Sequence, residues 1–211
     1  MPSGYLRTGG RRCTRERLQG NLGEVSKPVR RGRDGGVVSE FFYLHFADEE
    51  GLAVASAPDD PELDRRLASG GWIDDWSRLR FQLGKGIVVD YLANSFAYRL
   101  CSDVLRRTLD SRRSPVDVVQ WLPAIVSDPM GKELPYSILH FPEVPNVLNL
   151  TKSVLSGPMI VKAWLDGRLV DGHRIFSFPQ DTLRLVIAGE VKAAIESSRC
   201  TGMKFSRVPV A

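Results

Sequence analysis

The chain has 211 residues, 43% of them hydrophobic, and a formal net charge of +4. This length is enough to bury a core without help from metals or disulfides. The three cysteines, Cys13, Cys101 and Cys200, are odd in number and form no Cys-x-x-Cys pair, which argues against a disulfide framework or a zinc site. No apolar run approaches the length of a membrane span, and no apolar segment follows the first arginines as in a secretory signal. We therefore expect a cytoplasmic protein.

The positive charge is concentrated at the N-terminus. Residues 1–36 hold nine Arg and Lys against three Asp and Glu, whereas residues 37–211 hold 20 against 22. The first segment is rich in Gly and Arg and too poor in apolar groups to offset the entropy of ordering, so we expect a mobile basic tail. A single domain is expected over residues 37–211. An Arg/Gly arm could also bind nucleic acid through phosphate contacts, which is the alternative function.

Strands and helices can be placed along the domain from apolar periodicity. Strands are predicted at residues 37–46, 117–126, 135–141, 158–165 and 174–178, and a short helix near residues 62–68. Residues 78–92 resemble a hairpin turning at Gly84-Lys85-Gly86. Pro123 cannot donate to a ladder, so its strand is predicted to lie at a sheet edge or to contain a bulge. Ser102 is a good N-cap for a helix that ends near Asp110.

An acidic segment with two tryptophans separates the first strands. Residues 48–75 carry nine Asp and Glu against two Arg. Trp72 and Trp76 are spaced i, i+4, which on one helical turn places both indoles on one face and Asp74 and Asp75 on the other. Two interpretations stay open. The tryptophans are core residues beneath a solvated acidic face, or the four residues form a patch that binds a basic protein partner.

Residues 184–208 read as a strand, a short helix and a closing strand. The same unit recurs 86 positions earlier without a gap, which suggests an internal β-α-β duplication. Among the matched residues are Leu100, Leu105 and Leu109, paired with Val186, Val191 and Ile195. The sequence therefore predicts an α+β fold with a mostly antiparallel sheet and two or three short helices.

Motifs for catalysis or cofactor binding are absent from the sequence. There is no Gly-x-Ser-x-Gly, no His-Glu-x-x-His and no phosphate-binding Gly-rich loop, and the histidines His45, His140 and His173 are dispersed. Asp181, Glu190 and Lys192 have the spacing of a nuclease metal site, but that site needs the last two residues on a strand, and they fall in the predicted helix. We expect a protein that is not an enzyme and that has no cofactor or metal.

Several segments between residues 86 and 208 carry, in order, features of one family. They are Leu100-Cys101-Ser102-Asp103-Val104-Leu105, Val118-Val119-Gln120-Trp121-Leu122-Pro123, Pro135-Tyr136-Ser137-Ile138-Leu139, Asn146-Val147-Leu148-Asn149, Arg174-Ile175-Phe176 and Cys200-Thr201-Gly202-Met203-Lys204-Phe205. In this order the chain resembles the myxobacterial-type immunity proteins of polymorphic toxin systems, formerly a domain of unknown function. A Ser that usually starts the closing helix is Ala188 here.

The resemblance implies a non-catalytic protein of bacterial competition that binds and neutralises a cognate toxin by occlusion. Many antibacterial toxins act on nucleic acid and are basic, and an acidic inhibitor attracts such a partner over long range. The partner-binding residues expected on this ground are Trp72, Asp74, Asp75 and Trp76. The partner is then a toxin protein, and neither a membrane nor nucleic acid is required.

Overall fold

A computed structural model describes residues 39–57, 65–67, 70–157, 159–179 and 181–211. The chain divides after Gly36 into two units, residues 1–36 and residues 37–211. The predicted basic tail lies outside the described residues. So does most of the helix predicted near residues 62–68, of which residues 65–67 are described and helical.

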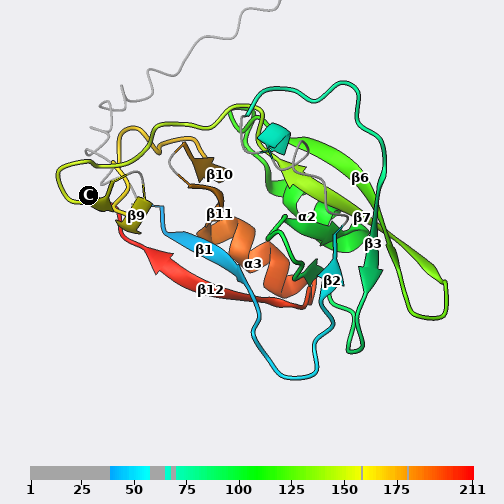
Figure 1. Cartoon of the computed structure of the whole chain (residues 1–211). Helices are drawn as coiled ribbons and strands as arrows, with labels where there is room; N and C mark the ends of the chain where they lie inside the picture. The colour runs from blue at the N-terminus through cyan, green and yellow to red at the C-terminus, as the bar shows by residue number, and fades with distance from the viewer. Residues whose placement is uncertain (1–38, 58–64, 68–69, 158, 180) are drawn as a thin grey trace, which may run out of the picture. The chain divides into compact units, whose positions relative to one another are not determined.

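Six strands form a mixed sheet in the spatial order β2-β3-β6-β7-β5-β4 (Figure 1). All neighbours are antiparallel except the parallel pair β3 and β6. The strands are β2 Ala55–Ser56, β3 Leu79–Leu83, β4 Tyr91–Leu92, β5 Leu100–Ser102, β6 Gln120–Ser127 and β7 Glu133–His140.

The other described strands form an antiparallel sheet of four, in the order β10-β11-β1-β12, and a separate ribbon of β8 and β9. They are β1 Phe41–Phe46, β8 Val154–Ser156, β9 Met159–Lys162, β10 Ile175–Phe178, β11 Asp181–Ala188 and β12 Met203–Val208. Together with the helices, these sheets confirm the predicted α+β class with mostly antiparallel pairing.

Two helices pack together between the large sheets (Figure 1). In α2, Asp103–Arg112, the Ser102 hydroxyl accepts a hydrogen bond from the Leu105 amide at 3.3 Å, as its N-cap position predicts. In α3, Gly189–Ser197, the N-cap is Ala188, whose side chain makes no cap hydrogen bond. The first turn of α3 is therefore held by other contacts, such as the bond from Gly189 N–H to Glu40 O at 2.8 Å.

The core has two clusters, which lie on opposite faces of the six-stranded sheet. Side chains along a strand alternate between its faces. On β7, Ile138 lies in one cluster with Phe81 and Leu122, whereas Leu139 lies in the other with Leu105 of α2. The second cluster also contains the buried faces of α3 and of the four-stranded sheet. It therefore joins the two halves of the domain, which are the six-stranded sheet with α2 and the four-stranded sheet with α3.

The two large sheets contain one arrangement twice. The order β4-β5-α2-β6, with β7 inserted between β5 and β6, matches β10-β11-α3-β12, with β1 inserted between β11 and β12. The helices begin 86 residues apart, at Asp103 and Gly189, as the repeat predicts. The following strands do not keep that offset.

Register shows where the offset is lost. In the first copy, Ser102 of β5 and Ala124 of β6 both pair with Tyr136 of β7, which lies between them. In the second copy, Ala188 of β11 and Val208 of β12 both pair with Phe41 of β1. The stretch from Ala188 to Val208 is therefore two residues shorter than the matching stretch from Ser102 to Ala124. The ungapped match is correct for the helices and wrong for the strands that follow them.

The predicted hairpin over residues 78–92 is wrong. Three strands separate β3 from β4 in the sheet. The backbone between them pairs with residues 51–54 instead. Ile87 N–H donates to Gly51 O at 2.8 Å, and Ala53 N–H donates to Ile87 O at 2.9 Å. These long-range pairs satisfy backbone groups that a hairpin would have paired locally.

The edge position predicted from Pro123 is also wrong, because β6 lies between β3 and β7, and there is no bulge, because β6 pairs with β7 in unbroken register from Gln120 to Ser127. Its pairing with β3 begins only at Ala124, opposite Leu79. Pro123 O accepts a hydrogen bond from the Trp76 indole at 2.8 Å on that side. N and C=O of one strand residue point the same way, so the missing N–H of Pro123 faces a position where β3 has not yet begun and costs no ladder bond.

We expect Gly202→Ala to lower the free energy of unfolding by about 3 kcal/mol. Gly202 has φ +86° at the start of β12, and a Cβ there would lie 2.4 Å from Val89 Cγ2 and 2.7 Å from Tyr91 O. The helix before it ends at Ser197, and Arg199, with φ +54°, takes the left-handed conformation that follows the helix.

Gly131→Ala is the matched control for that measurement by urea denaturation. Gly131 has a similar φ of +82° but nothing within 4 Å of its Cβ position, so only the backbone strain of about 1 kcal/mol applies. Equal losses in the two variants would show that the contact with Val89 and Tyr91 is unimportant.

Candidate functional site

The four residues predicted to bind a partner lie on a loop, residues 70–76, here called the Trp72 loop. It contains no helical turn, so the predicted arrangement with both indoles on one face is wrong. Ile73 is the buried residue of the loop and packs with Phe81 and Leu122. Burial of Ile73 turns its neighbours outward, and this was not visible in the i, i+4 spacing.

The backbone of the Trp72 loop is fixed to the six-stranded sheet at two places. The Gln120 side-chain amide accepts from Ile73 N–H at 3.1 Å and donates to Ile73 O at 2.8 Å, like a paired strand residue. Gly71 N–H donates to Pro142 O at 2.7 Å, and His140 Nε2 donates to Gly71 O at 2.8 Å. The loop is therefore held in one conformation before any partner arrives.

Three of the predicted residues are displayed to solvent. Trp72 is 59% exposed, Asp74 is exposed, and Asp75 is exposed and forms an ion pair with Arg66. Trp76 is half-buried and packs against the core, and its indole N–H donates a hydrogen bond to Pro123 O. The loop thus presents one indole beside two carboxylates, and Trp76 supports the loop from below.

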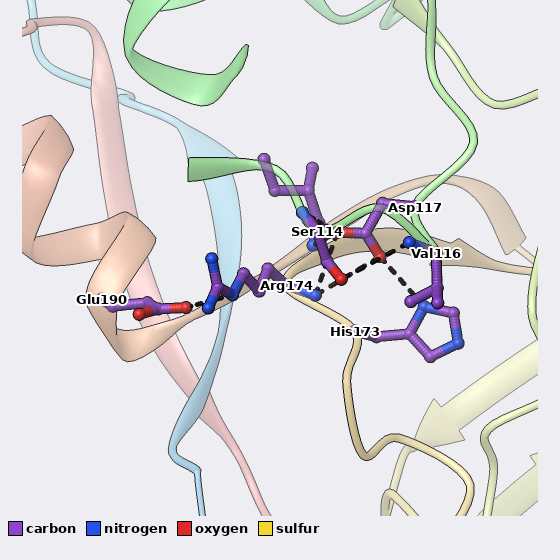
Figure 2. Close-up of polar contacts among 7 residues, drawn as sticks. Ser114, Val116, Asp117, His173, Arg174 and Glu190 are labelled. Atoms are coloured by element: carbon purple, nitrogen blue, oxygen red, sulfur yellow. Dashed lines mark hydrogen bonds and ion pairs between the residues drawn. The ribbon is translucent and has the colours of Figure 1, made fainter. Parts of the chain in front are cut away.

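The most connected polar group of the described residues was not predicted. Asp117 follows α2 in the loop before β6, and its side chain is fully buried. It accepts from three backbone N–H groups, those of Ser114 at 3.1 Å, Arg174 at 3.1 Å and Ile175 at 3.0 Å (Figure 2). His173 Nδ1 donates to its other oxygen at 2.9 Å. No local pattern pointed to this cluster, because its two halves are 56 residues apart.

The Asp117 cluster joins the two halves of the domain. Ser114 and Asp117 come from the segment after α2, whereas residues 173–175 lead into β10. Arg174 reaches further and forms an ion pair with Glu190 in the first turn of α3 (Figure 2). The carboxylate and this ion pair therefore fix the starts of β10 and α3 to the segment that follows α2.

An Asp–His pair is also half of a general-base arrangement, since the carboxylate orients the imidazole and leaves Nε2 free to accept a proton. The pair borders a cavity of about 140 Å³ lined mainly by apolar side chains, including Val116, Phe141 and Val144. Among the described residues no hydroxyl or thiol bonds to His173 Nε2, and Ser114 Oγ instead accepts from the Val116 amide. The cluster supplies a base without a nucleophile, and its contacts fit a structural role.

The spacing that suggested a nuclease metal site is not realised. Asp181 begins β11, whereas Glu190 and Lys192 lie beyond the other end of that strand on α3. Lys192 pairs with Glu196 at 2.6 Å and Asp181 with Arg184 at 2.7 Å. Within the part of the chain that the structure describes, no group of three metal-ligating side chains gathers.

A wider hollow of about 390 Å³ lies beside β1 and includes His45, Arg184 and Lys204. Its cations already have partners, because Arg184 bonds to Asp181 and Lys204 to Asp48 at 2.6 Å. His45 bonds to the Ser206 hydroxyl at 2.7 Å, and burial lowers its pKa. With its charges balanced in this way, the hollow has no excess charge to attract an ionic ligand.

No family model matches the chain, and no curated protein gives a significant match. In the described ranges, no helix is long and apolar enough to cross a membrane. Functional inference therefore rests on the residues themselves, and above all on the exposed Trp72 loop.

We expect Asp117→Asn to lower the free energy of unfolding by about 3 kcal/mol, measured by urea denaturation. The amide nitrogen would face N–H donors inside the protein and leave them without an acceptor. Asp128→Asn is the matched control, because its Oδ1 accepts from the Met130 and Lys132 amides in an exposed turn and asparagine can do the same. A loss below about 1 kcal/mol in both variants would contradict a central role for Asp117.

Stability should fall with acidification because of His140. Burial lowers the pKa of this imidazole, and the bond to Gly71 opposes that effect only in part. The unfolded chain takes up a proton near pH 6.5 that the folded chain resists, so the stability is complete above that pH and is lost as the pH falls. Denaturation at pH 7.5 and 5.5 should show this slope, and His140→Asn should flatten it. His45 accounts for the slope that remains, and an unchanged slope in His140→Asn would contradict the assignment.

Proposed function

We propose that this protein is an immunity protein that binds a cognate bacterial toxin and blocks it without catalysis, using the Trp72 loop as the centre of contact. The observation that carries the proposal is a 59% exposed tryptophan on a loop whose backbone is already fixed. Tryptophan is among the residue types most enriched at the hot spots of protein interfaces, so an exposed one on a fixed loop is a candidate anchor.

Preorganisation makes this loop suited to tight binding. Association costs free energy when flexible segments become ordered at an interface. The bonds of Ile73 to Gln120 and of Gly71 to Pro142 remove that cost in advance, because the loop conformation is set by the sheet. Trp72 can then enter a pocket of the partner with only its own side chain to order.

Charge selects the partner. Asp74 and Asp75 follow Trp72 on the same loop, where Asp75 pairs with Arg66, and residues 37–211 hold 22 Asp and Glu against 20 Arg and Lys. Carboxylates at the rim of an interface accelerate encounter with a basic surface more than they add affinity. A basic nuclease-type toxin, whose own active site attracts phosphate, has the matching surface. The resemblance of residues 86–208 to immunity proteins points to the same class of partner.

The alternative, nucleic-acid binding by the basic arm, depends on residues 1–36. These lie outside the described residues, so that function stays a prediction of the sequence.

The proposal is tested with the protein encoded by the neighbouring open reading frame. We expect Trp72→Ala to weaken binding about 30-fold, the loss of a typical hot-spot residue, as measured by calorimetry. Met130→Ala is the control, because Met130 is 91% exposed in the turn after β6 and lies on another surface. The same toxin should arrest growth when expressed with the Trp72 variant and not with wild type. Unchanged affinity in Trp72→Ala would remove this loop from the interface.

A second test separates local charge from total charge. The double swap Asp74→Lys with Asp75→Lys should slow association roughly tenfold at low salt, with the effect fading as salt rises. Glu49→Lys with Glu50→Lys changes the net charge equally at another exposed turn and should change the rate less. Equal effects would show that only overall charge matters.

A further inference from the structure

The ribbon of β8 and β9 exposes apolar side chains on both of its strands, and Met159 and Val161 share one face of β9 because side chains alternate along a strand. Met159 is 65% exposed, Val161 61% and Val154 51%. Leu155 is 40% exposed as well. Ser156 lies opposite Met159 and Val154 opposite Lys162, so these groups share one short strand pair. Adjacent exposed apolar side chains of this kind mark an interaction surface.

The outer edge of the ribbon is open for pairing. Among the described strands β8 pairs only with β9, and every residue of β8 is exposed. A strand edge of this kind carries unpaired N–H and C=O groups that can hydrogen-bond to an added strand.

Two lysines give the ribbon a charge preference. Lys152 Nζ lies 5.3 Å and Lys162 Nζ 5.7 Å from the centre of the Trp164 ring. Neither forms an ion pair with a carboxylate of the described residues, in contrast to Lys192 and Lys204. Two ammonium groups on one indole, without a neutralising carboxylate, attract an acidic group from outside.

The ribbon is also anchored to the domain. Ile160 is buried in the core, and its carbonyl accepts from Arg184 Nη2 at 3.0 Å. The Ser153 hydroxyl accepts from Trp164 N–H at 3.0 Å and donates to Trp164 O at 3.2 Å. The edge and the lysines therefore keep a fixed relation to each other.

We propose that β8 accepts an added strand from a partner protein, and that this strand alternates apolar and acidic residues. Its apolar side chains extend the face that exposes Met159 and Val161, and its carboxylates pair with Lys152 and Lys162. This surface is distinct from the Trp72 loop, and the inference goes beyond the function proposed above.

Charge and backbone chemistry distinguish this occupant from two others. A second copy pairing through β8 would bring its own lysines beside Lys152 and Lys162, which is unfavourable. A membrane surface would leave the unpaired backbone groups of the edge without partners in hydrocarbon. An acidic strand satisfies both the lysines and the edge.

The test uses two labelled ten-residue peptides, one alternating valine with glutamate and one alternating valine with lysine. Fluorescence anisotropy should show binding of the Val/Glu peptide at least tenfold tighter than that of the Val/Lys peptide. The double variant Lys152→Glu with Lys162→Glu should reverse the preference, and Lys132→Glu in the turn between β6 and β7 should not change it. Hydrogen exchange of the bound protein should slow at residues 154–156.

Four results would each overturn the proposal. They are failure of both peptides to bind, equal binding of the two, protection that excludes residues 154–156, and a preference that survives the double lysine variant. Binding to phosphatidylserine vesicles in place of the peptide would assign the ribbon to a membrane, and ribbon-dependent dimers in sedimentation would assign it to a second copy. None of these results depends on the Trp72 loop, so the proposed function is tested separately.

Discussion

A buried carboxylate holds the two halves of this domain in register. Asp117 accepts three backbone N–H groups and one imidazole N–H, from segments that are far apart in the chain. Burial of a charge is expensive unless hydrogen bonds compensate for it, and here four donors do so. Because Arg174 in the same cluster pairs with Glu190, the geometry of α3 also depends on it. This connection keeps the start of β10 beside the segment that follows α2.

How far the sequence predicts the fold depends on how local each interaction is. The C-terminal unit was recognisable because β11, α3 and β12 follow each other with clear changes of period. Pro123 and residues 78–92 were misinterpreted because their partners, the Trp76 indole and residues 51–54, lie elsewhere in the chain. The same reason explains the site. Trp72, Asp74 and Asp75 are exposed as a binding patch requires, but Gln120, which fixes their loop, is 47 residues away. No sequence pattern near Asp117 or His173 predicted their hydrogen bond, because the two residues are 56 positions apart.

The two proposed contact surfaces carry different chemistry. The Trp72 loop offers an indole beside carboxylates and rests on the six-stranded sheet, whereas the ribbon offers aliphatic groups and lysines and is anchored through Ile160. In both places the backbone is fixed by bonds to buried elements while the side chains remain in water. Affinity at such surfaces comes from a few displayed groups, because the cost of ordering the backbone has been met by folding.

The place of β1 in the four-stranded sheet has a consequence for synthesis on the ribosome. β7 is made shortly after the strands on either side of it, so the first copy of the repeat can assemble from a nascent chain. β1 is made before every other described strand, and both of its neighbours, β11 and β12, are made last. Its aromatic side chains therefore lack these neighbours until residues 181–208 have been made. Slow closure of such distant pairs exposes a strand to aggregation, so nascent-chain chaperones should engage this protein through its first strand.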